Sequence, residues 1–505
     1  MSHYLARGCG AAIVYAFAAQ GALADLTAED VWTEWRAYLT GVGYEISGNE
    51  SRTGSGLTVT DVSMSMQLPE NSGMFSVGMP ELEFRENGDG TVSVVMPARV
   101  PMRFEATDGE EQVNGEIGLG QTDASLVVSG SPADMIYTYT AAQMRIALDS
   151  LMVDGQTVPP EIGHVSMDLG NVASTTRVKQ GGMRDYSQTM QADQVTYDVA
   201  FKDPDSAESA KIKGAIQGLS FEGTGRIPMQ LDTGDLQKMM ADGFAFDGRF
   251  AYASGSSSMA VQGTGDDFSY EGSSQGGSLG MAMDASHLAY ALSQTGTSVN
   301  IASAELPFPV SFQLQEVGFS IDMPVAKSDE QQPFAFGMTM AGFTMPDMLW
   351  GIFDPGAILP RDPATIALDL TGKVKVLFDL LDPESAAMME DQPPGELHAL
   401  TIRNLLVSAV GASLSGTGDF TFDNSDLQSF DGMPKPAGKA DLTLVGANGL
   451  IDKLIQMGFV SDQDAMGARM MMGMLAVPGD APDTLNSTIE INEQGHIMAN
   501  GQRIK

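Results

Sequence analysis

The sequence predicts a mainly β protein, a β-rich α+β fold of curved antiparallel sheets with a few short helices. Short segments that alternate apolar and polar residues recur along most of the chain, and glycine, serine, aspartate and asparagine separate them. Only a few segments space their apolar residues as a helix would. The 505 residues, 43% of them apolar, exceed one typical domain and can supply more than one core.

The first 24 residues are typical of a cleavable signal peptide. Arg7 provides a positive start, and the apolar stretch 9–19 follows it. Ala22 and Ala24 form a small-x-small cleavage site, so Asp25 is expected to begin the mature chain. The alternative is a buried N-terminal helix, which the charge placement and the cleavage site do not favour. We therefore expect export to the periplasm.

Cys9 is the only cysteine, and it lies inside this leader. It is a poor lipoprotein cysteine, because Arg7 stands where a small residue is expected. The mature chain would then contain no thiol and form no disulfide. No later segment approaches the roughly 20 apolar residues of a membrane-spanning helix, so the sequence predicts no transmembrane segment in the mature chain.

A first β-rich unit is expected over residues 25–230, and it begins with a helix. Thr27 and Asp30 fit a capping box. Trp32 and Trp35 follow at helical spacing, and we interpret them as the face by which the helix packs onto a sheet rather than as a ligand site.

Two features of the strands that follow are specific. In the segment 57–68 the apolar positions change from odd to even numbers near Asp61, which predicts a bulge or a turn there. Residues 87–90 read Asn-Gly-Asp-Gly between two strand-like runs, which predicts a hairpin.

A second β-rich unit is expected over residues 231–505, ending in a helix pair and two closing strands. A repetitive meander is expected over 244–325 and a further strand over 373–381. Four segments show helical spacing or capping: 232–243, 345–353, 448–459 and 462–477.

The charge excludes one class of partner. Twenty-seven basic residues face 65 acidic ones, a formal net charge of −38. Such a chain repels phosphate backbones and bare anionic membranes, so no nucleic-acid partner is expected. Calcium binding is an alternative use of the acidic residues, but they are spread along the chain and no calcium loop is present.

Three common motifs for catalysis, cofactors or metals are absent from the sequence. It contains no HExxH motif, no Walker loop and no complete GxGxxG motif. The histidines after the leader lie far apart in sequence, at His164, His287, His398 and His496. We therefore expect no catalytic, cofactor-binding or metal site. A hydrolase with a non-local site would need two or more of these histidines beside carboxylates in one cleft.

Methionine is unusually frequent, with 34 residues. Met470, Met471, Met472 and Met474 cluster in the last helical segment. Methionine fills irregular gaps in cores, which is the interpretation we favour; a pliable surface for lipid or for a polypeptide is the alternative.

The chain resembles the domain of unknown function 2125 family of exported Gram-negative proteins. The resemblance rests on VWTEW with LTVTDVSMSM, on FRENGDGTVSV, on MPDMLWGIFDP with LPRDPATIALDLTG, and on the C-terminal LIDKLIQMGFVSDQDAMGARMMMGML with IEINEQGHIMANGQR. A weaker likeness exists to AsmA-like and YdgA-like envelope proteins. The family resemblance implies no activity and no site residues.

The expected function is non-enzymatic binding of a lipid or other amphipathic partner in cell-envelope maintenance. A periplasmic protein-interaction or chaperone-like adaptor is the alternative, and the hydrolase is a third. The first hypothesis predicts that the inner faces of the sheets form a continuous apolar groove and that the purified protein carries lipid.

Overall fold

The computed structural model describes most of the chain: residues 25–68, 72–108, 111–203, 206, 208–231, 235–263, 267–382, 385 and 392–505. The predicted signal peptide, with Ala22 and Ala24, lies outside the described residues. Asp25, the expected first mature residue, is the first one described and lies just before the first helix.

The N-terminal part of the molecule contains one helix and nine strands: α1 (Ala28–Gly41), β1 (Glu45–Thr53), β2 (Gly56–Gln67), β3 (Gly73–Glu86), β4 (Val92–Val95), β5 (Arg99–Asp108), β6 (Glu111–Thr122), β7 (Ser125–Ser131), β8 (Asp134–Val153) and β9 (Gln156–Thr157). The middle part is nearly all strand: β10 (Gly163–Gln180), β11 (Met183–Lys202), β12 (Ser209–Pro228), α2 (Leu236–Ala241), β13 (Ala245–Tyr252), β14 (Ser254–Gln262), β15 (Phe268–Ser274), β16 (Gly277–Met283), β17 (His287–Ser303), β18 (Val310–Pro324) and β19 (Gln332–Phe343). The C-terminal part carries the remaining helices: α3 (Asp347–Phe353), β20 (Ala364–Val376), β21 (Gly395–Ala409), β22 (Ala412–Asp423), β23 (Lys435–Val445), α5 (Ala447–Gln456), α6 (Asp462–Leu475), β24 (Val477–Pro478), β25 (Thr484–Ile491), β26 (Ile497–Ala499) and β27 (Gln502–Arg503).

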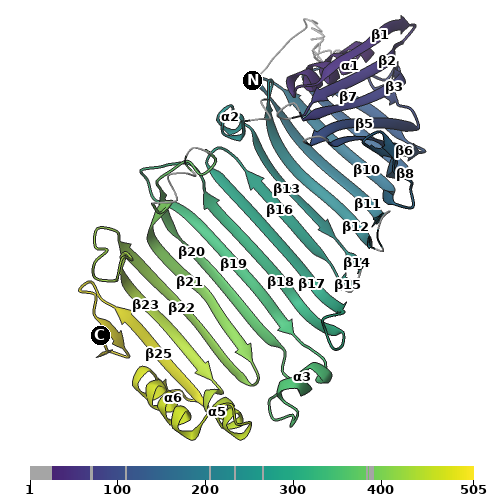
Figure 1. The fold of residues 1–505 in the computed structure, drawn as a ribbon. Coiled ribbons are helices and arrows are strands. Elements are labelled where there is room, and N and C mark those ends of the chain that lie inside the picture. Colours follow the sequence, from purple (N-terminus) through teal and green to yellow (C-terminus); the bar gives the residue numbers. More distant parts are fainter. Residues whose placement is uncertain are drawn as a thin grey trace, which may run out of the picture.

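These strands form one long antiparallel sheet, which runs the length of the molecule in Figure 1. Most neighbours in the sheet are also neighbours in sequence, because hairpins join them. Strand β12 pairs along one half with β13 and along the other with β14; these meet β16 and β15, and both of those pair with β17. The prediction of a mainly β protein built from antiparallel sheet is therefore confirmed.

The sheet continues across residue 230, where the sequence suggested a boundary between two units. Strands β12 and β13 pair there, with residues such as Phe221 and Phe250 directly opposite each other. Whether residues 25–230 and 231–505 fold as separate units stays a prediction.

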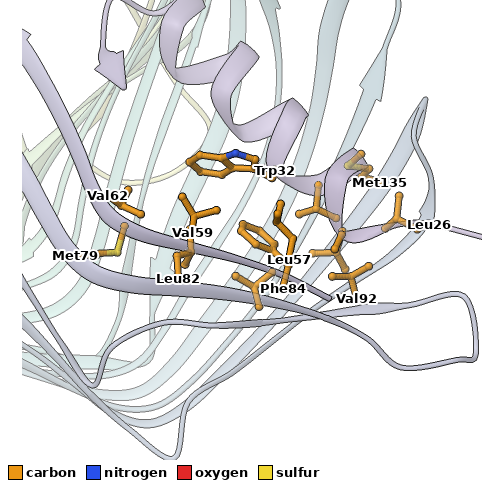
Figure 2. Packing of buried hydrophobic residues seen from close by; sticks show 14 of the residues in the cluster. Leu26, Trp32, Leu57, Val59, Val62, Met79, Leu82, Phe84, Val92 and Met135 are labelled. Carbon is orange, nitrogen blue, oxygen red and sulfur yellow. The ribbon is translucent and has the colours of Figure 1, made fainter. Parts of the chain in front are cut away.

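Helix α1 packs against one face of the sheet at its N-terminal end, where the main core lies (Figure 2). The predicted capping box is present, since Thr27 and Asp30 bond each other's backbone N–H groups. The rings of Trp32 and Trp35 lie 5.8 and 5.7 Å from the ring of Phe84 on β3. The prediction that this pair docks a helix onto a sheet is confirmed.

The change of apolar parity in β2 has the predicted cause. Asp61 has a φ of 53°, a left-handed conformation that interrupts the alternation of side chains along the strand. Val59 and Val62, three residues apart, are therefore both buried in the same core. The strand keeps one apolar face although its sequence changes phase.

Strands nearer the middle of the sheet also contain a residue in the left-handed conformation, which the sequence did not reveal. These residues, which form a line across the strands, have positive φ: Asn171 on β10, Gly218 on β12, Gly296 on β17 and Gly342 on β19. A smaller core crosses this line, because residues on both sides of it pack together: Leu169 with Val172, Ala192 with Val195, and Ile216 with Leu219. We call this line of left-handed residues the seam.

Other local predictions have mixed outcomes. The hairpin at residues 87–90 is confirmed, with positive φ at Gly88 and Gly90, and so is the terminal helix pair α5 and α6. The strand expected over 373–381 is wrong in its second half. Strand β20 ends at Val376, and Leu380 instead donates its backbone N–H to the carbonyl oxygen of Val325.

Candidate functional site: an apolar sheet face

The most distinctive surface is a row of large apolar side chains that crosses the middle of the sheet. Residues that pair directly across antiparallel strands lie on the same face. Seven successive pairings connect the row from β12 to β21: Phe221, Phe250, Leu279, Leu292, Phe319, Met338, Leu368 and Leu405. The row is therefore continuous across eight strands.

The flanking positions on this face are also apolar over much of its width. On one side of the row lie Met281, Tyr290, Ile321, Phe336, Leu370 and Ile402. On the other side lie Val317, Met340, Ile366 and Val407. We call this surface, from β12 to β21, the apolar face.

The opposite face of the same strands has a different composition. One residue along from the apolar row, the paired positions are Glu222, Arg249, Gly280, Ala291, Ser320, Gly337, Asp369 and Asn404. Small and charged side chains therefore occupy this polar face, and on it His287 and Asp322 form a hydrogen bond. The sheet is strongly amphipathic.

No described element forms a second layer over the middle of the apolar face. Met281 is 49% exposed, and Leu292 and Phe319 are 39% and 38% exposed. In Figure 1 the helices α2, α3, α5 and α6 lie at the margins of the sheet rather than over β16–β19. Apolar patches of this extent on a protein surface usually mark a binding site.

A pocket of about 470 Å³ deepens the apolar face at one margin. Strands β18 to β21 supply Ile321, Met323, Phe334, Phe336, Leu370, Val374 and Leu397. The segment after β20 contributes Leu380, which its hydrogen bond of 2.8 Å to Val325 holds in place. Pockets for apolar ligands have this type of lining.

Helix α1 covers the same face at its N-terminal end. Its Glu34 forms an ion pair of 2.6 Å with Arg184 on β11, and both side chains are buried. Tyr38 of α1 packs against Tyr186, whose ring centroid lies 6.0 Å away. Burial raises the pKa of both tyrosine hydroxyls, so these surroundings disfavour charge and the ion pair must be satisfied internally.

The four histidines do not converge. His164 lies on β10 beside Ser166, His287 begins β17, His398 lies on β21 near Glu396, and His496 precedes β26. Each therefore meets its own neighbours, and they do not form the cleft that the hydrolase hypothesis requires. Among the described residues, no group of three or more His, Cys, Asp or Glu side chains is arranged to hold a metal ion.

The interpretation of the methionines as core-filling holds only in part. Met79 in β3 and Met135 in β8 are buried in the main core. Met470, Met471 and Met474 on α6 are each more than half exposed, so gap filling is the wrong explanation for them. They are surface residues because α6 packs at the margin of the sheet through few side chains, of which only Ala465 is buried.

Sequence reasoning found the alternation in residues 244–325 and suggested an apolar binding surface, but it did not identify the residues that form the apolar face. The available signal was the sequence itself, for example FAFDGRFAYAS, LAYALS and VGFSIDM. Alternation assigns residues to the two sides of one strand. Only the register shows that the apolar sides of eight strands join.

Fold and site together define a class of protein: a long, open, amphipathic antiparallel sheet with an uncovered apolar face. No helix among the described residues is long and apolar enough to cross a membrane. The chain belongs to the family described as an uncharacterised protein conserved in bacteria, domain of unknown function 2125, whose model matches residues 243–498. No curated protein and no solved structure matches the chain.

Proposed function

We propose that this protein binds lipids on its apolar face without chemical turnover and serves cell-envelope maintenance in the periplasm. The observation that carries the proposal is the uncovered row of large apolar side chains from Phe221 to Leu405. Burying such side chains against acyl chains is favourable by about 25 cal/mol for each Å² removed from water. The periplasmic location rests on the export signal in residues 1–24.

The dimensions of the face favour several acyl chains over one. Neighbouring strands lie about 4.8 Å apart, so seven steps from β12 to β21 span roughly 35 Å. Half of a bilayer's hydrocarbon core, the depth of one acyl chain, is about 15 Å. The pocket between β18 and β21 is a place where one chain would be held more firmly than on the open face.

The test is native mass spectrometry of protein purified from the periplasm, together with lipid extraction. We expect the wild type to carry phospholipid. The double variant Leu292→Asp and Phe319→Asp places two charges on the apolar face and should lose most of it, because charged groups are costly to bury against hydrocarbon.

The chain offers a matched control for this experiment. Ala291→Asp and Ser320→Asp place the same two charges on the same two strands, one residue away and on the polar face. This variant should retain lipid. Lipid-free wild-type protein, or equal lipid content in both variants, would refute the proposal.

A chaperone-like adaptor is the second candidate, and the exposed methionines of α6 favour it, since methionine-rich surfaces adapt to varied apolar partners. In that case extraction would yield no lipid, and crosslinking in the periplasm would recover polypeptide partners that depend on Met470 and Met471.

A further inference from the structure

The most exposed apolar side chains of this protein gather at one margin of the sheet. Among the described residues, eight large apolar side chains are more than half exposed. Only Met433 lies elsewhere; the other seven belong to α3, to α6 or to the turn between α5 and α6: Met348, Ile352, Phe459, Met466, Met470, Met471 and Met474. We call these seven residues the helical edge.

Two segments about a hundred residues apart in sequence form the helical edge. Helix α3 joins the ends of β19 and β20, and α5 and α6 follow the end of β23, all on the same side of the sheet (Figure 1). Between them lies the β21–β22 turn, where a Cβ on Gly411 would lie 3.0 Å from Pro360 and 3.9 Å from the ammonium of Lys453 on α5. The two helical segments thus border the same turn.

Each segment is fixed in position, so its exposed side chains are held outward. After α3, the buried carboxylate of Asp354 accepts hydrogen bonds from the backbone N–H groups of Ile358 and Leu359, at 2.9 and 3.0 Å. At α5, the carboxylate of Asp483 accepts from the N–H groups of Asn448 and Gly449, at 3.1 and 2.9 Å. The edge is therefore part of the folded sheet.

The charges at the helical edge indicate the kind of partner. On α6, Met466, Met470 and Met474 follow at intervals of four residues and share one side of the helix. The basic residue beside them, Arg469, is paired at 2.5 Å with Asp452. Asp462 and Asp464 in the first turn add negative charge, so this surface attracts neither an anionic membrane nor nucleic acid.

The apolar face reaches the helical edge. Ile366, two residues into β20 from the end that α3 joins, pairs with Val407 near the end of β21, and they are 42% and 40% exposed. Both belong to the flank of the apolar row that is nearest to α3. Apolar surface thus extends from the protruding helices onto the sheet.

We propose that the helical edge docks on the surface of a zwitterionic phospholipid bilayer, by inserting its methionine, isoleucine and phenylalanine side chains between the lipids. Such insertion depends on buried apolar area and needs no basic residues when the lipids carry no net charge. The proposal builds on the lipid-binding function, because a docked edge would let acyl chains reach the apolar face without crossing water.

Vesicle flotation with purified wild-type protein tests the docking. Phosphatidylcholine vesicles should carry the protein upward, with little dependence on salt concentration. Vesicles of phosphatidylglycerol should bind less protein at low salt, because the chain carries a net charge of −38. Stronger binding to phosphatidylglycerol at low salt would overturn the proposal.

Three equally exposed residues supply matched variants. Ile352 on α3, Met470 on α6 and Met433 away from the edge are each 64% exposed. Ile352→Glu and Met470→Glu combined should lower the vesicle-bound fraction about tenfold or more. Met433→Glu should leave it unchanged. Equal binding by the combined variant and the wild type would overturn the proposal.

Two further readouts separate this proposal from its alternatives. If the edge instead joins two copies of the chain, light scattering will show a wild-type dimer that the combined variant converts to monomer, without vesicle binding by either; this outcome overturns docking. Wild-type protein that carries lipid but does not float refutes docking alone. Wild-type protein that floats but never carries lipid supports docking and refutes the function proposed above.

Discussion

The ion pair between Glu34 and Arg184 should contribute strongly to holding α1 on the sheet. Both side chains are almost fully buried, and the Nε of Arg184 lies 2.6 Å from the carboxylate of Glu34. Nη2 donates a longer hydrogen bond of 3.5 Å to the other carboxylate oxygen of Glu34, and Nη1 is buried without a hydrogen-bond partner. Removing Glu34 would therefore leave a buried cation without any counter-charge.

The expected cost is large and has a specific signature. Glu34→Ala should lower the free energy of unfolding by about 3–5 kcal/mol, because the remaining guanidinium stays desolvated and unpaired. Replacing both partners, with Glu34→Leu and Arg184→Met, should restore most of the loss, since no charge then remains buried. A simple loss of contacts would make the double variant worse than the single one.

Urea unfolding followed by tryptophan fluorescence is a suitable assay. The chain has three tryptophans, and Trp32 and Trp35 both lie on α1. A cost below about 1 kcal/mol for Glu34→Ala, the range of an exposed ion pair, would refute the reasoning. So would a double variant whose loss equals or exceeds the sum of the two single losses.

Three other predictions follow from local features. Asp61→Val should lower the free energy of unfolding by about 1–2 kcal/mol in urea titrations, because a β-branched residue disfavours a left-handed φ. Asp61→Gly should lower it less, and equal losses for the two variants would contradict this prediction. Burial raises the pKa of Asp483, but hydrogen bonds from Gly449 and Asn448 outweigh it and hold the pKa below its ordinary value of 3.8. The stabilisation from this carboxylate is therefore complete above pH 3.8 and is lost as the pH falls through the lowered pKa. Asp483→Asn should lower the melting temperature at neutral pH but not in strong acid. An equal loss at both pH values would contradict this prediction. N-terminal sequencing of exported protein should begin at Asp25, and an intact leader would disprove cleavage.

Local sequence patterns predicted many elements correctly where short-range physics decides them. The capping box at Thr27, the hairpin at residues 87–90 and the bulge at Asp61 each depend on a few neighbouring residues. The strand expected over 373–381 failed at Leu380, because a hydrogen bond to distant Val325 redirects the chain there.

The candidate site was predictable only as a tendency. The sequence showed amphipathic strands, and it suggested an apolar groove as one outcome. An amphipathic strand has the same sequence pattern whether its apolar side is covered by a second layer or left bare. The exposure of Phe319 and of Met470 therefore could not be read from alternation or composition.

By itself, the sequence determined the β-rich class, the acidic charge and the amphipathic character of each strand, because these follow from residue type and near-neighbour spacing. The tertiary structure alone decided how those strands combine. The register of the strands aligned Leu279, Leu292 and Phe319 into one row. Where the apolar positions of a strand change from odd to even numbers, the left-handed residues of the seam interrupt the alternation, so the apolar side chains stay on the same face. Pairings between strands and the placing of helices at the margins are long-range events, and they turned a repetitive pattern into one exposed apolar face.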